Sequence, residues 1–73
     1  MSATLFTAAG HALYGSLWQS ELARSLEVSD RTVRRWIRGD SEIPHGVWGD
    51  LRVLCLERAR ALDDMARKLG QRP

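Results

Sequence analysis

The chain has 73 residues, of which 44% are hydrophobic and 27% charged, and its net charge at pH 7 is +2. This length predicts a single domain, residues 1–73, that buries only about 60% of its unfolded surface, so a partner subunit is expected to help. The apolar fraction and the three tryptophans exclude a disordered chain. No apolar stretch approaches the roughly 20 residues that cross a bilayer, and we expect no secretory leader and a cytoplasmic location.

Few residues are available for covalent or metal chemistry. Cys55 excludes an intramolecular disulfide, and its place on the apolar side of an expected helix suits a small buried side chain better than a nucleophile. His11 and His45 belong to no group with metal-ligand spacing, so neither a metal nor another cofactor is predicted. Asp63 and Asp64 diverge by about 100° on a helix, and the common hydrolase, nucleotide-binding and metalloprotease motifs do not occur. We therefore expect no enzyme.

The first helix is expected over residues 5–14. Thr4 is the candidate N-cap, and Gly15 is the expected C-terminal stop. Gly10 lowers the helix propensity of this segment. Trp18 comes next, and its indole is expected to pack on the domain, the alternative being an N–H bond to a phosphate. The expected inward side chains of the helix are Leu5, Phe6, Ala9 and Leu13.

Residues 19–38 predict two short helices joined by a tight turn. Gln19 lies in the first turn of the first helix, where free N–H groups and the helix dipole favour a phosphate, although it can also be a simple helix-start residue. Ser29 is the expected N-cap of the second helix, and the carboxylate of Asp30 complements its dipole. Gly39 ends it.

The second helix separates apolar from cationic residues. At about 100° per residue, Val33, Trp36 and Ile37 fall on one side, so Trp36 is expected to be structural. The arginine fork can donate two hydrogen bonds to guanine in the major groove, or one to a phosphate. The alternative is the solvated face of an ordinary amphipathic helix, but that face would normally mix charges of both signs. The opposite side carries Arg31, Arg34, Arg35 and Arg38.

This segment resembles the twenty-residue helix-turn-helix of the phage repressor and Cro-like (Xre) class. Glu27 departs from the pattern, because the family usually has glycine at this turn position. A non-glycine residue with positive φ costs about 1 kcal/mol there, or else the turn takes a slightly different form. The resemblance covers roughly residues 17–48 and implies an all-α, four- or five-helix lambda-repressor-like domain. The matching residues are Gln19, the small Ala23 at the helix crossing, the apolar Leu22, Leu26 and Val28, and the inward Val33 and Trp36.

The resemblance also implies roles in binding double-stranded DNA. Asp30 at a base-facing position can accept from cytosine N4, although capping and dipole roles account for it equally. Asp40 and Glu42 oppose close approach of their loop to phosphates. The base-facing positions are Asp30, Arg31, Arg34 and Arg35, and the positions near the DNA backbone are Gln19, Ser29, Thr32, Arg38, Ser41 and His45.

A long C-terminal helix is expected over residues 44–69, with Pro44 as its first residue. At about 1.5 Å per residue it would span roughly 39 Å, longer than the roughly 30 Å of a small domain, so its end should overhang. A break into two helices is the alternative. Val53 and Leu56 lie away from the main apolar stripe, which consists of Trp48, Leu51, Cys55, Ala59, Leu62, Ala66 and Leu69, widened by Leu54 and Met65.

We expect a sequence-specific transcriptional regulator, a repressor, of bacterial or phage origin and associated with the nucleoid; no small-molecule effector is evident. The alternatives are an antitoxin-like protein with a protein partner and a protein-interaction module without DNA. One domain offers too few base contacts to select a site among the competing sequences of a genome. We therefore expect a homodimer that reads two DNA half-sites one helical turn, about 34 Å, apart. Residues 62–69 can instead pack on the first helix. The expected dimer surface comprises Val53, Leu56, Leu62, Met65 and Leu69.

Overall fold

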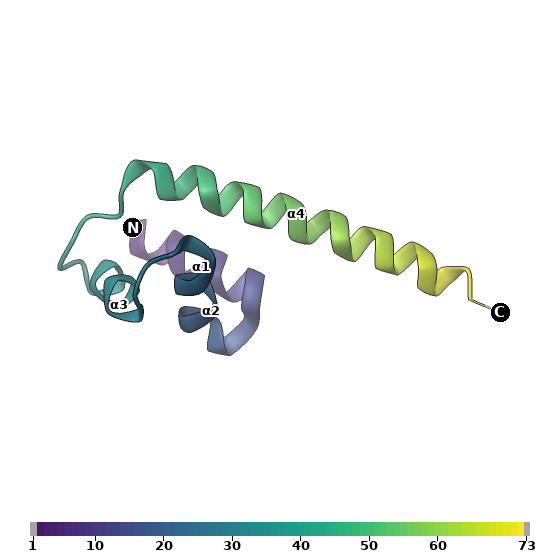
Figure 1. The fold of residues 1–73 in the computed structure, drawn as a ribbon, viewed down its shortest axis with the longest axis horizontal. Coiled ribbons are helices and arrows are strands. Elements are labelled where there is room, and N and C mark those ends of the chain that lie inside the picture. The colour runs from purple at the N-terminus through teal and green to yellow at the C-terminus, as the bar shows by residue number, and fades with distance from the viewer. Residues whose placement is uncertain (1, 73) are drawn as a thin grey trace.

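The computed structural model describes residues 2–72 and is all-helical there, as predicted. Its elements are α1 (Ser2–Tyr14), the short 3-10 helix η1 (Gly15–Leu17), α2 (Trp18–Leu26), α3 (Asp30–Arg38) and α4 (His45–Gly70). Helices α1, α2 and α3 form a globular part beneath the first half of α4, and the second half of α4 projects beyond it (Figure 1). The molecule therefore measures 52 × 22 × 21 Å.

Helix α1 begins three residues earlier than the sequence suggested. It starts at Ser2, so Thr4 lies inside the helix and the prediction that it is the N-cap was wrong. Leu5 was also wrongly placed in the inward stripe, because its side chain is 63% exposed. Phe6 and Leu13 fix the buried side of α1, and Leu5 lies about 100° from Phe6 around the helix.

At Gly10 the Trp18 ring of α2 lies directly against α1. A Cβ added at Gly10 would lie 2.0 Å from Cε3 of Trp18, a separation that atoms cannot adopt. Trp18 is buried, which confirms the prediction that it packs on the domain. Gly10 therefore lowers the helix propensity of α1, but the missing side chain leaves the space that the Trp18 ring fills.

Phe6 is the centre of the core. It is fully buried, and its ring meets those of Trp18, Trp36 and Trp48 edge to face, with centroids 5.8, 5.6 and 6.5 Å away. Edge-to-face pairs of this kind add to the stabilisation that burial of the rings already provides. Since the three tryptophans belong to α2, α3 and α4, one side chain of α1 joins all four helices.

Helix α4 is continuous, so the alternative of two helices is wrong. It begins at His45, with Pro44 as the residue before it rather than its first residue. Val47 and Leu51 are buried against the globular part, and Val47 was not among the predicted core residues. From Leu56 to residue 72 every residue is exposed, so the C-terminal end overhangs as predicted and does not pack on α1.

Within residues 2–72, none of the helices combines the length and the hydrophobicity that crossing a membrane requires.

Candidate nucleic-acid interface

Helix α3 is held to the globular part by one side. Val33 is fully buried, Trp36 is 5% exposed, and Ile37 is half-buried. These are the three residues whose spacing predicted an inward face, and the structure confirms that prediction. Because two large side chains are anchored in the core, the opposite side of the helix is presented to solvent in a fixed orientation.

Both ends of α3 are capped. The Ser29 side chain accepts a hydrogen bond from the Thr32 backbone N–H (3.1 Å), and its backbone is extended, so the predicted N-cap is confirmed. The hydroxyls of Ser29 and Thr32 also lie 2.9 Å apart within hydrogen-bond distance. At the other end Gly39 has φ 80°, and the Asp40 N–H donates to the Arg35 carbonyl (2.9 Å). These caps fix the length of the helix and satisfy N–H and C=O groups that would otherwise lack partners.

The turn between α2 and α3 is tight because of one strained residue. Glu27 has φ 59° and ψ 41°, which is the left-handed conformation, and its N–H approaches the carbonyls of Ala23 and Arg24. Val28 N–H then donates to the Ala23 carbonyl (2.9 Å). The turn thus has the positive φ that favours glycine, even though the residue in place is glutamate.

The outer face of α3 is strongly cationic. All four of its arginines are exposed, and together with Asp40 they line one open hollow on the surface: Arg31, Arg34, Arg35 and Arg38. Their positions span an arc of about 100° around the helix, opposite the buried face. Four guanidinium groups on one short helix supply both positive charge and donors in a planar geometry that suits phosphates and guanine.

Among residues 2–72, the carboxylate that lines this hollow is that of Asp40. Arg38 Nη1 lies 4.0 Å from Asp40 Oδ2, and both side chains are more than half exposed, so the pair is weak. Among the described residues, the ion pairs made by other arginines are Arg24 with Glu21 (2.9 Å) and Arg67 with Asp63. The guanidinium groups at the middle of the hollow therefore keep their hydrogen-bond donors available.

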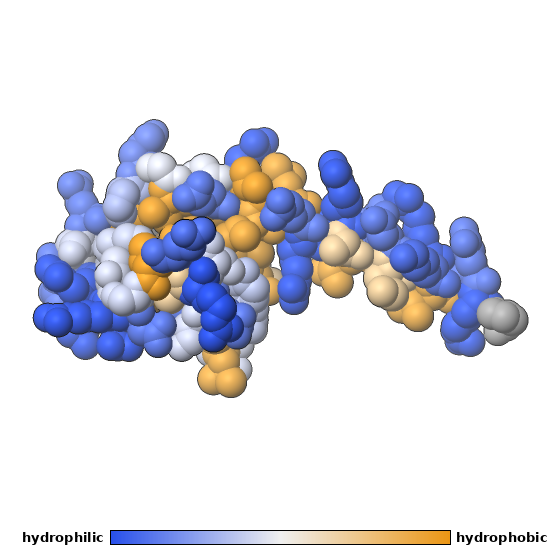
Figure 2. Space-filling model, viewed as in Figure 1, coloured by the Kyte–Doolittle hydropathy of each residue, from blue (hydrophilic) through white to orange (hydrophobic). Residues whose placement is uncertain are grey.

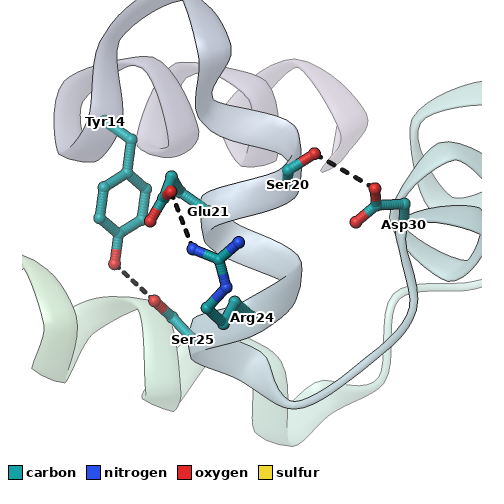
Figure 3. A network of polar contacts seen from close by, with 6 residues as sticks. All are labelled: Tyr14, Ser20, Glu21, Arg24, Ser25 and Asp30. Carbon is teal, nitrogen blue, oxygen red and sulfur yellow. Dashed lines mark hydrogen bonds and ion pairs between the residues drawn. The ribbon is translucent and has the colours of Figure 1, made fainter.

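Asp30 lies beside the cationic face and is tied to α2. The Ser20 hydroxyl donates to Asp30 Oδ2 (3.1 Å), and this bond joins the first turns of α2 and α3 (Figure 3). The carboxylate thus has a fixed position at the positive end of the α3 dipole. The sequence did not predict this bond, because residues ten apart give no periodic signal.

A second hydrogen bond between side chains holds α2 to α1. The Tyr14 hydroxyl lies 2.6 Å from the Ser25 hydroxyl, which links the end of α1 to the last turns of α2 (Figure 3). The guanidinium of Arg58 from α4 stands over the Tyr14 ring, 5.9 Å from its centre. Beyond Arg58, α4 leaves the globular part.

The structure does not bring all the predicted backbone-contacting residues to the arginine hollow. Gln19 is exposed at the start of α2 and lines a separate hollow with Leu17 and Glu21. Ser41 and His45 line another hollow at the C-terminal end of α3, where Glu42 is also present. These three residues are thus placed around α3 rather than on its arginine face.

A metal site is not formed within residues 2–72, where no three or more His, Cys, Asp or Glu side chains are grouped to hold an ion. Comparison of this chain with protein-family models, with curated proteins and with solved structures found no match.

Proposed function

We propose that this protein is a sequence-specific transcriptional regulator, a repressor, that binds double-stranded DNA and inserts α3 into the major groove. The observation that carries the proposal is the outer face of α3, with four exposed arginines backed by a buried Val33 and Trp36. A short helix anchored on one side and cationic on the other fits the major groove, which is about 12 Å wide. In this proposal α2, the Glu27 turn and α3 form the helix-turn-helix of a lambda-repressor-like domain.

The positions of the side chains suggest different roles. Arg31, Arg34 and Arg35 would contact base edges or the adjacent phosphates, and Arg38, whose charge is partly offset by Asp40, would position the helix on the DNA backbone. Asp30 would add one acceptor for cytosine N4 through the oxygen that Ser20 leaves free. Base contacts select the sequence, whereas phosphate contacts fix the position of the protein.

Selection of binding sites from random duplexes, at a stated salt concentration, tests this proposal directly. The expected result is an enriched site with guanines in each half. Enrichment of no sequence, with binding no stronger than that of an arginine-rich peptide of equal charge, would favour a protein-interaction module instead.

A second candidate function has support from α4. Its overhanging half is exposed and carries Leu62, Met65 and Leu69, a surface suited to a protein partner. An antitoxin-like protein would bind DNA through α3 and another protein through this surface. For the transcriptional regulator, we propose that the partner is a second copy of the chain. A single domain offers few base contacts, each worth about 1 to 3 kcal/mol, and a homodimer doubles their number. The protein would then act in the cytoplasm, associated with the nucleoid.

A further inference from the structure

The overhanging half of α4 is sharply amphipathic. Between Ala59 and Leu69, at 100° per residue, the charged residues occupy an arc of about 140° and the apolar residues the remaining side. The charged set is Arg60, Asp63, Asp64, Arg67 and Lys68, and the apolar set is Ala59, Ala61, Leu62, Met65, Ala66 and Leu69. Figure 2 shows the hydrophobic surface on the underside of this half, on the same side of α4 as the globular part.

This apolar side continues the one that packs on the globular part. Leu51 is 4% exposed, whereas Leu62, Met65 and Leu69 are 60%, 51% and 59% exposed. Leu69 lies five turns beyond Leu51 and has the same direction around the helix axis. A helix with so wide an apolar stripe normally buries it, and α1 covers only the first half.

We propose that the second half of α4 is covered by the same half of a second copy, in antiparallel orientation. This inference rests on the homodimer of the proposed function but not on its DNA contact. Antiparallel pairing about a twofold axis between Met65 and Ala66 sets Leu62 of each copy over Leu69 of the other. It also sets each Met65 against an Ala66, a long side chain beside a small one, so the surface is complementary to itself, as a twofold dimer requires.

Parallel pairing is opposed by both shape and charge. The globular part occupies the same side of α4 as the apolar stripe, so parallel copies in register would place two globular parts in one volume. Arg58, which continues the heptad spacing of Leu51 and Met65, would also face its own counterpart. In the antiparallel arrangement, each globular part instead lies end to end with the C-terminus of the other copy.

The charges also favour a protein over a membrane surface. The polar side of the overhang mixes three basic and two acidic residues, and Arg67 pairs with Asp63. Amphipathic helices that lie on anionic lipid carry mainly Lys and Arg on this side. The paired segment is only about 18 Å long, a small contact, so we expect an equilibrium between monomer and dimer that depends on concentration.

Sedimentation equilibrium of the full chain, from micromolar to submillimolar concentration and without DNA, tests the existence of the dimer. Leu62→Glu should abolish self-association and leave the far-UV circular dichroism unchanged, because Leu62 makes no contact with the globular part. Leu56→Glu is the matched control: Leu56 is 55% exposed but lies outside the apolar stripe, and this variant should dimerise normally. A wild-type monomer throughout, or a Leu62→Glu protein that still dimerises, would overturn the proposal.

Disulfide trapping in a Cys55→Ala background tests the orientation. Leu62→Cys alone and Leu69→Cys alone should form no disulfide-linked dimer under mild oxidation, whereas a mixture of the two should give the mixed disulfide. Self-linked Leu62→Cys without the mixed product would establish a parallel dimer and overturn the inference. These experiments contain no DNA, so they can fail while α3 still selects a DNA sequence, and the converse is also true.

Discussion

The ring of Trp36 stands at 89° to that of Phe6, with the two centroids 5.6 Å apart, and this contact fixes α3 on α1. Trp36→Ala removes this contact and leaves a cavity, so we expect the free energy of unfolding to fall by about 3 to 5 kcal/mol. That loss is comparable to the whole stability of so small a domain. Thermal melting would measure the loss. If the variant melted like the parent but lost DNA binding, Trp36 would belong to the contact surface instead of the core.

Gly10→Ala should destabilise the protein even though alanine is the better helix former. The new methyl group would meet the Trp18 ring, and relieving that overlap is expected to cost about 1 to 3 kcal/mol. Gly49→Ala in α4 is the control, because nothing lies within 4 Å of the added methyl. That substitution should instead stabilise the protein by about 0.5 to 1 kcal/mol. The two variants should therefore shift the denaturant midpoint of unfolding in opposite directions.

Glu27→Gly should stabilise the turn between α2 and α3. Glutamate at φ 59° carries a steric cost that glycine avoids, so we expect a gain of about 0.5 to 1 kcal/mol, reduced by the greater freedom of glycine in the unfolded chain. Gly39→Ala, at φ 80°, should have the opposite effect, of about 1 kcal/mol. A Glu27→Gly variant that is less stable would mean that the glutamate side chain makes a contact worth more than the strain.

The sequence predicted local features better than tertiary ones. The Ser29 cap, the Gly39 stop and the inward Val33 and Trp36 follow from patterns within ten residues, and all are present. Leu5 was misplaced because two adjacent apolar residues fit one stripe almost equally well, and only packing against the tryptophans distinguishes them. The tight approach at Gly10 and the Ser20 bond to Asp30 arise between elements, where spacing carries no signal.

The four arginines of α3 should differ in their effect on DNA binding. Arg34→Ala is expected to cost about 1 to 3 kcal/mol and to relax preference at one base pair, whereas Arg38→Ala should weaken all sequences alike and reduce the salt slope by about one unit. Arg60→Ala is the control, because it removes the same charge from an exposed position on α4. Equal losses in all three variants, on specific and random duplexes, would mean that α3 contributes charge without reading bases.

The antiparallel dimer also changes the expected spacing of the half-sites. Trp36 of α3 and Trp48 of α4 both pack on Phe6, so α3 lies near the N-terminal end of α4, far from the paired segment (Figure 1). With Leu62 over Leu69 of the other copy, the N-terminal ends of the two α4 helices are roughly 60 Å apart, at 1.5 Å per residue.

That separation is closer to two turns of B-DNA, about 68 Å, than to the single turn expected from the sequence. Sites selected from random duplexes should therefore contain inverted half-sites centred about 20 base pairs apart, and Leu62→Glu should enrich single half-sites. If inverted half-sites about 10 base pairs apart were enriched, the DNA-bound dimer would have to use another surface of α4, such as the one that carries Val53 and Leu56. In that case Leu56→Glu, rather than Leu62→Glu, would abolish the paired site.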